Sequence, residues 1–188
     1  QESMYWLTGY DTFGYVFFQS LVLDQSGKIV LLTRAPDLRQ AQNTSNIEDI
    51  RIWVDKDESN PSDDLKIILN EFSLNGKKVG IEYEAYGMTG RNALRLNKSL
   101  ENYCSIEDQS ELITKLRVVK SKEEIVYVRK AAELADKALD EAWKHAKAGV
   151  SESKILAEMN RIIFEGGGDY PANEFIIGSG DNALLCRY

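Results

Sequence analysis

Few residues of this chain combine the chemistry and the spacing that catalysis needs. The single histidine, His145, stands in the last turn of a helical pattern, where a histidine usually has a structural role. Cys186 has no histidine near it in sequence to activate it as a nucleophile, which favours a buried, inert thiol. Arg187 is the sharper candidate, because a guanidinium fork can hold a substrate carboxylate with two hydrogen bonds. A structural ion pair is the alternative for Arg187, and both remain open.

Metal and phosphate sites are not predicted. The many carboxylates between Glu123 and Glu141 fall mostly on one solvated helix face, and no His, Cys, Asp or Glu cluster has metal-ligand spacing. We therefore expect no cofactor and no metal in this chain. The run Gly178-Ser179-Gly180 lacks the longer phosphate-loop pattern, so it indicates a tight turn instead.

Composition narrows the class of protein. The 188 residues are 43% hydrophobic and 28% charged, as in a folded globular chain, and the formal net charge is -7. An acidic chain without a Lys/Arg cluster argues against a nucleic-acid partner, and the apolar runs are too short to span a membrane. The two cysteines do not suggest a disulfide framework, so we expect reduced thiols and a cytoplasmic protein.

The first part of the chain alternates predicted strands and helices. Residues 21–23 and 29–33 flank a Gly-containing turn and predict a β-hairpin. Pro61 opens a helix that ends before Asn75-Gly76. Further strands are predicted at residues 51–54 and 78–83, and a further helix at residues 89–100. Such alternation indicates an α/β fold with a mostly parallel sheet.

The second part is predicted to be helical. Ser121 and Glu124 form a capping box that opens a long helix. Its buried face is expected at helically spaced apolar residues: Ile125, Val128, Ala132, Ala135, Leu139, Ala142 and Ala146. Ser151 is expected to cap a second helix, with a stripe of Ile155, Met159, Ile162 and Ile163, and a strand is expected at residues 175–177. The change of pattern predicts a domain boundary between about Ile113 and Ser121.

Three motifs resemble the creatinase/prolidase group of "pita-bread" hydrolases, which includes Xaa-Pro peptidases. Residues 4–11, Met-Tyr-Trp-Leu-Thr-Gly-Tyr-Asp, are similar to the Leu-Thr-Gly motif of that group's N-terminal domain. Residues 116–125 resemble the Lys-Ser-x-x-Glu junction that starts the catalytic domain, and residues 175–182 resemble its first strand and Gly-Ser-Gly-x-Asn loop. The order and separation of the three motifs make the resemblance specific over nearly the whole chain.

The resemblance implies that the chain is divided into two domains and that each domain is incomplete. It implies a creatinase/prolidase N-terminal-like domain at residues 1–116, in which the first strand and helix of the group are missing. Residues 117–188 would be the truncated start of an α+β pita-bread catalytic domain. The Asp, Asp, His, Glu and Glu that bind two metals in the peptidases would lie after Tyr188, so this chain alone is expected to be inactive.

The resemblance also implies an activity class. We expect part of a homodimeric hydrolase of amide or amidine C–N bonds in a small molecule or short peptide. Arg187 stands where peptidases commonly carry a His, which favours a metal-free creatinase-like or ectoine-hydrolase branch. The alternatives are a Xaa-Pro dipeptidase that uses Mn, Co or Zn, and a non-catalytic binding or dimerisation module. Besides Arg187, the expected substrate-binding residues are Tyr10, Asp11 and Phe13, in a loop after the first strand. Core packing of the aromatic rings is the alternative for that loop.

Overall fold

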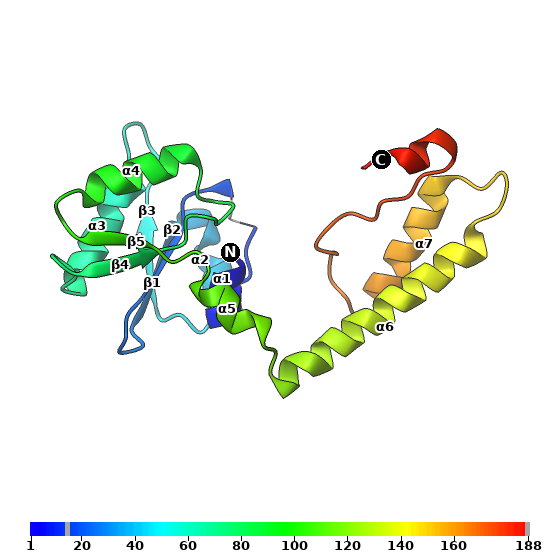
Figure 1. Cartoon of the computed structure of the whole chain (residues 1–188), viewed down its shortest axis with the longest axis horizontal. Helices are drawn as coiled ribbons and strands as arrows, with labels where there is room; N and C mark the ends of the chain where they lie inside the picture. The colour runs from blue at the N-terminus through cyan, green and yellow to red at the C-terminus, as the bar shows by residue number, and fades with distance from the viewer. Residues whose placement is uncertain (14–15, 187–188) are drawn as a thin grey trace. The chain divides into compact units, whose positions relative to one another are not determined.

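The computed structural model describes residues 1–13 and 16–186, which fold into two compact units. The first unit comprises Gln1–Val119 and the second Lys120–Tyr188. Figure 1 shows an α/β unit with labels α1 to α5 and a helical unit built on α6 and α7. No helix in the described ranges is both long enough and apolar enough to cross a bilayer.

The first unit is a mixed sheet structure with helices against it. Its strands form two groups: β1, β2 and β3 are neighbours in one sheet, and β4 and β5 pair in another. The β1–β2 pairing is antiparallel, whereas β2–β3 and β4–β5 are parallel, as the alternating pattern predicted. The elements are α1 (Glu2–Thr8), β1 (Ser20–Leu23), β2 (Ile29–Arg34), α2 (Leu38–Thr44), β3 (Asp49–Trp53), α3 (Pro61–Glu71), β4 (Lys78–Ile81), α4 (Gly90–Leu100), β5 (Ser105–Asp108) and α5 (Leu112–Val118).

The β1–β2 hairpin is confirmed, and its turn is built by one aspartate. Asp24 Oδ1 accepts hydrogen bonds from the amides of Ser26, at 2.8 Å, and Lys28, at 3.1 Å. These bonds, led by the Ser26 hydroxyl, hold the pKa of Asp24 below its usual value. Gly27 takes a φ of 84°, in the left-handed region that glycine adopts without strain.

The two faces of the β1–β2–β3 sheet pack into two separate cores. Alternate residues of a strand point to opposite faces, so Val30 and Leu32 enter one core while Leu31 enters the other. The larger core joins the sheet to α3 and α4, and includes Leu65, Leu100 and other buried side chains. The smaller core contains Tyr10, Leu31, Ala41 and Ile47.

The structure corrects the prediction of a strand before Tyr10. Residues 2–8 form α1, which ends at Gly9 in the left-handed conformation with φ of 79°. The Thr8 hydroxyl donates back to the Met4 carbonyl at 2.6 Å, which adds a side-chain bond to the last turn. Helix α2, strand β5 and helix α5 were not predicted, because each is short and carries little periodic signal.

The second unit is a helical hairpin of α6 (Lys122–His145) and α7 (Glu152–Glu165). The capping box is confirmed: Ser121 Oγ accepts from the Glu124 amide at 3.1 Å, and Glu124 accepts from the Ser121 amide at 2.7 Å. The predicted stripe of α7 lies on its inner side, with Ile155 buried. The predicted cap by Ser151 is wrong, because its hydroxyl contacts Ser153 and makes no capping bond.

Two further predictions for this unit are wrong. The expected buried face of α6 is exposed, including Val128 and Leu139, and the residue of α6 that is buried is Ala138. α7 covers a different stripe of α6, near Leu134, whose side chain packs against Gly166 and Gly168. The expected strand at residues 175–177 is irregular chain instead, because no described strand of this unit lies beside it to pair. A 3-10 turn, η3 (Gly180–Leu184), follows.

Candidate functional site

The loop that follows α1 carries three of the four predicted site residues, and Gly9 sets its start. A Cβ at Gly9 would lie 2.8 Å from the Thr44 carbonyl oxygen, so only glycine fits without a shift of the backbone. The Thr8 carbonyl accepts from the Asn46 amide at 3.0 Å, and the Asp11 amide donates to Thr44 Oγ1 at 3.1 Å. The loop is therefore pinned to the end of α2.

The loop places its predicted site residues in two environments. Tyr10 is completely buried in the smaller core, which is the packing alternative that the sequence left open, and its hydroxyl has no hydrogen-bond partner. Asp11 and Phe13 face solvent, Phe13 with 77% of its surface exposed. The structure thus separates Tyr10, a core residue, from Asp11 and Phe13, which are exposed.

Arg34 is a candidate that the sequence did not single out. It lies at the carboxyl end of β2, where ligands of open α/β sheets commonly bind. Its guanidinium carbon stacks 3.2 Å from the centre of the Phe17 ring, and its Nε is 3.4 Å from Asp37 Oδ2. Since Asp37 already neutralises the guanidinium, the contact primarily fixes the turn into α2. The signal that could have found it is a charged residue ending a buried strand.

The Gly-Ser-Gly-x-Asn loop of the second unit folds as the tight turn that its sequence indicated. A Cβ at Gly178 would lie 2.9 Å from the Asn182 carbonyl, and Gly180 has a φ of 56°. Ser179 Oγ donates to Glu152, which ties the turn to the start of α7. Arg187 lies outside the described residues.

The two cysteines differ in exposure, and neither is in a disulfide. Burial raises the pKa of the half-buried Cys104 thiol, which makes it a weaker nucleophile. Cys186 is exposed, so the expectation of a buried thiol at that position is wrong.

His145 belongs to a side-chain cluster that was not predicted from the sequence. One turn earlier on α6, Glu141 Oε1 lies 3.1 Å from His145 Nε2, and Glu158 approaches from α7. Two cations share the cluster: Lys144 Nζ is 2.9 Å from Glu141 Oε2, and Arg161 Nε is 2.8 Å from Glu158 Oε2. Lys144, followed by His145, holds the pKa of Glu141 below its usual value. The missed signal was the i,i+4 spacing of Glu141 and His145.

The geometry of this cluster suits an ion-pair network better than a metal site. A divalent ion at Glu141 and Glu158 would have to displace Arg161, which also lies 2.6 Å from Glu165. A dinuclear peptidase centre needs more ligands than this group of three offers. The described cluster therefore does not fit the metal centre of the resembled peptidases, and its clear role is to join α6 to α7.

Comparison with protein families gives two matches in sequence order. Residues 1–119 match the Creatinase/Prolidase N-terminal domain, and residues 126–188 match Metallopeptidase family M24. The first match alone covers more than half of the chain.

Individual relatives agree with these matches. The ectoine hydrolase of Halomonas elongata is 27% identical over 198 residues, which cover 97% of this chain and 49% of that protein. The Xaa-Pro dipeptidase of Pyrococcus furiosus is 30% identical over 115 residues, or 61% of this chain and 32% of that protein. The chain thus spans less than half of the length of either relative.

Solved structures show the same fold. The prolidase from Pyrococcus furiosus superposes with a TM-score of 0.72 at 23% identity, over 94% of this chain and 50% of that one. The prolidase from Pyrococcus horikoshii gives a TM-score of 0.73 at 22% identity, over 98% of this chain and 48% of that one. The described units thus have the α/β and pita-bread architecture of prolidases, and the chain belongs to the creatinase/prolidase family.

Proposed function

We propose that this chain is part of a hydrolase that cleaves a C–N bond in a small molecule or a short peptide. The observation that carries the proposal is the order of the two family matches, an N-terminal domain followed by M24 sequence, along one chain. Two relatives described above support it, because their names, ectoine hydrolase and Xaa-Pro dipeptidase, are those of enzymes that hydrolyse such bonds. We place the boundary between the N-terminal domain and the catalytic domain at about Leu116, where the junction motif of residues 116–125 begins.

Among the substrates of this class, we favour a small molecule with a carboxylate, as an ectoine-type hydrolase would take. The match to the ectoine hydrolase extends over 97% of this chain, whereas the match to the dipeptidase covers 61%. The resemblance gives Arg187 the position of a peptidase His, and an arginine suits a carboxylate. A Xaa-Pro dipeptidase remains the second candidate, because its sequence identity, at 30%, is higher over the shorter region.

Two exposed residues of the first unit are proposed to face the substrate in a cytoplasmic homodimer. Asp11 would accept a hydrogen bond from, or pair with, a nitrogen of the substrate, and Phe13 would cover its apolar part. What supports this is their exposure on a loop that Gly9 and Thr44 hold rigidly at its start. Tyr10 would act as the buried anchor of this loop rather than as a substrate contact.

Hydrolysis of a C–N bond needs an activated water, a stabilised oxyanion and a proton for the departing nitrogen. Asp11 and Phe13 are assigned to binding and orienting a ligand, and Tyr10 to anchoring their loop, so none of the three is assigned those steps. The residues that do so are proposed to come from the M24 portion of the protein. The ion-paired Glu141–His145–Glu158 group is assigned no part in them.

A two-substrate assay tests the proposal. Ring opening of ectoine and hydrolysis of Ala-Pro are each followed by chromatography, with and without added Mn²⁺, Co²⁺ or Zn²⁺, for the protein that carries this chain. Cleavage of ectoine without Ala-Pro cleavage supports the favoured branch, and the reverse identifies the dipeptidase. If neither substrate is cleaved and neither binds, the proposed hydrolase activity on them is contradicted. The alternative of a non-catalytic binding or dimerisation module then replaces it.

Matched variants test the residue assignment. Asp11→Asn is expected to raise KM for the cleaved substrate with little change in kcat, because its role is recognition. Asp57→Asn, at another exposed acidic position of the first unit, should leave KM unchanged. Equal effects of the two variants would remove Asp11 from the site.

A further inference from the structure

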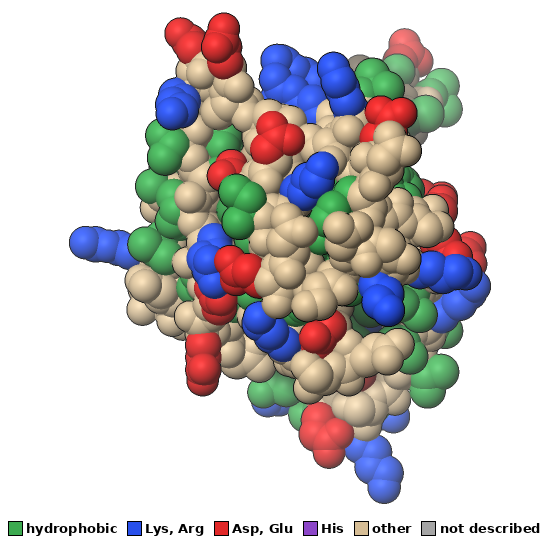
Figure 2. Space-filling model, turned by 90° about the vertical axis from the view of Figure 1, so that its left-hand side faces the viewer, with side chains coloured by type: hydrophobic (Ala, Val, Ile, Leu, Met, Phe, Trp, Pro, Cys, Tyr) green, Lys and Arg blue, Asp and Glu red, His purple; other side chains and the backbone are tan. Residues whose placement is uncertain are grey.

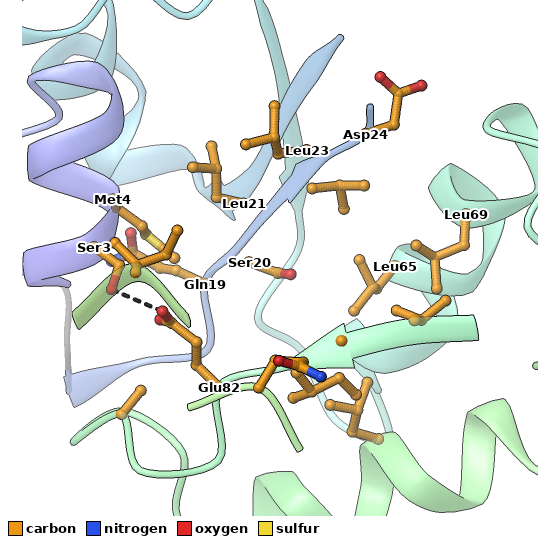
Figure 3. A pocket seen from close by; sticks show the side chains of 18 of the residues that line it. Ser3, Met4, Gln19, Ser20, Leu21, Leu23, Asp24, Leu65, Leu69 and Glu82 are labelled. Carbon is orange, nitrogen blue, oxygen red and sulfur yellow. Dashed lines mark hydrogen bonds between the residues drawn. The ribbon is translucent and has the colours of Figure 1, made fainter. Parts of the chain in front are cut away.

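The loop between α1 and β1 is held at both of its ends. At its start, the Asp11 amide donates to Thr44 Oγ1 at 3.1 Å. At its far end, the Phe18 carbonyl accepts from Trp53 Nε1 at 3.0 Å, and both of these side chains are buried in the larger core. Figure 3 shows the chain beyond this point, where Ser20 begins β1. The exposed residues that the structure describes in this loop therefore lie between two fixed points.

Two adjacent strand ends hold the far end of the loop. Arg34 ends β2 and Trp53 ends β3, and the two residues are partners in the parallel register. Arg34 follows Leu32 on the face of β2 that packs into the larger core, because alternate residues of a strand share a face. Trp53 holds the carbonyl of Phe18, and the guanidinium carbon of Arg34 lies 3.2 Å from the centre of the Phe17 ring. Two consecutive loop residues are thus held by two neighbouring positions of the sheet.

The ion pair of Arg34 does not account for its contact with the ring. Arg34 Nη2 donates to Asp37 Oδ2 at 3.4 Å, which is longer than the usual hydrogen bond of about 2.7–3.2 Å. Asp37 neutralises the charge, whereas the flat face of the guanidinium lies on Phe17, and a cation over an aromatic face is attracted to it. The Arg34 side chain is only 15% exposed, so packing fixes its position. Phe17 is 41% exposed, and the stack gives this surface ring a fixed place.

We propose that Arg34 is a positioning residue, which holds through Phe17 the loop that carries Asp11 and Phe13. The inference rests on the proposed function, in which Asp11 and Phe13 face the substrate. Releasing Phe17 removes one of the fixed points of the loop. Asp11 and Phe13 then sample more conformations, and a ligand must order them when it binds.

A direct contact between Arg34 and a substrate carboxylate is the weaker role for this residue. Asp37 already takes the charge of the guanidinium, and Phe17 lies on its face. A substrate carboxylate would have to compete with Asp37 for the same cation. Arg34 therefore acts on the substrate through the loop.

A double-mutant cycle separates the two roles. Arg34→Met, Phe17→Leu and the double variant are made in the protein that carries this chain, and hydrogen exchange is measured at the amides of Asp11 and Phe13. Each single variant is expected to speed exchange roughly two- to fivefold, the factor that corresponds to a cation–π contact at a partly exposed site. The double variant should exchange no faster than the faster single variant, because both changes remove the same contact.

Matched variants control for a general loss of stability. Phe17→Tyr keeps an aromatic ring under the guanidinium and should leave exchange unchanged. Arg51→Met removes another arginine of the same sheet, one that pairs with Asp49 and Glu71, and should also leave exchange in the loop unchanged. Circular dichroism establishes that each variant is folded. If Arg34→Met does not fold, the comparison of Phe17→Leu with Phe17→Tyr decides whether the ring holds the loop.

Kinetics on the substrate found in the two-substrate assay give a second readout. Arg34→Met and Phe17→Leu should each raise KM by about the factor seen in exchange, with little change in kcat, because a positioning residue affects recognition. The double variant should raise KM no further than the larger single effect.

Three outcomes overturn the proposal. The first is unchanged exchange in both single variants. The second is effects that add in the double variant, since Arg34 and Phe17 would then act independently. The third is a KM that rises in Arg34→Met but not in Phe17→Leu, which would assign Arg34 to direct substrate contact. Coupled exchange with KM unchanged in Arg34→Met and in Asp11→Asn would support the positioning role, and would contradict the assignment of Asp11 to the substrate instead.

Discussion

The two units of this chain differ in how far they bury their apolar side chains. In the first unit, both faces of the β1–β2–β3 sheet are covered, and Val30, Leu31 and Leu32 are almost completely buried. In the second unit, α6 and α7 cover one stripe of each other, while Val126, Leu139 and Trp143 are half or more exposed. The difference teaches that an amphipathic helix pattern guarantees a buried face only when the element that covers it is at hand.

The two units differ in how much of their apolar surface is buried, but they do not differ in this way in their surface charge. Figure 2, which is viewed from the side of the first unit, shows acidic and basic side chains interspersed over that face rather than gathered by sign. Ion pairs such as Lys78–Glu107, at 2.6 Å, and Arg161–Glu165, at 2.6 Å, occur in both units. Pairs as exposed as these contribute little to stability, so the contrast between the units lies in their packing.

The largest expected effect comes from truncating a leucine, and two such truncations compare the buried core of the first unit with the exposed face of α6. Leu32→Ala should lower the free energy of unfolding by about 2–5 kcal/mol, because Leu32 is 1% exposed and its loss leaves a cavity. Leu139→Ala, at a helix position that is 52% exposed, should change it by about 0.5 kcal/mol or less. Urea unfolding followed by circular dichroism measures both, and similar losses would mean that the face of α6 is covered in solution.

A second pair compares two glycines of the first unit that share a positive φ. Gly9→Ala places a Cβ 2.8 Å from the Thr44 carbonyl, in addition to the backbone strain, and should cost roughly 1–3 kcal/mol. Gly27→Ala carries a similar strain in open space and should cost about 1 kcal/mol. Thermal unfolding should therefore show a larger drop in Tm for Gly9→Ala. The reverse order would show that the α1 loop is not pinned to α2.

A third pair compares the two helix starts of the second unit. Ser121→Ala removes a capping bond and should destabilise α6 by ~1 kcal/mol. Ser151→Ala should have almost no effect, because the Ser151 hydroxyl makes no capping bond to α7. The rate of hydrogen exchange at the amides in the first turn of each helix measures the two losses of stability separately. Equal fraying would indicate that Ser151 does cap α7 in solution.

The smallest expected effect is the pH dependence of the α6–α7 contact. The pKa of Glu141 is lowered in the folded chain, so this group adds stability above the ordinary glutamate pKa. That stability is lost as the pH falls through the lowered pKa. Between pH 6 and pH 3, α6 should lose more protection from hydrogen exchange in the natural chain than in Glu141→Gln. The same loss in both would assign the acid sensitivity to other carboxylates.

What could be predicted from sequence depended on whether the signal was local. The β1–β2 hairpin and the Ser121–Glu124 box were correct because neighbouring residues alone make their bonds. The stripe of α6 and the strand at residues 175–177 were wrong because both require a distant partner. Within the candidate site, the sequence named this loop but did not separate buried Tyr10 from exposed Phe13. That separation depends on Leu31, Ala41 and Ile47, which tertiary packing brings together.

The Ser121–Glu124 box also has a consequence for how such proteins can be assembled. It begins at Ser121, two residues after Val119, the last residue of the first unit, and it satisfies the amides of Ser121 and Glu124 from within its own four residues. These two bonds at the start of α6 therefore need no group from the residues that precede Ser121. A junction of this kind is modular: gene fusion or exchange upstream of Ser121 can attach a different leading domain and leave the first turn of the helix intact.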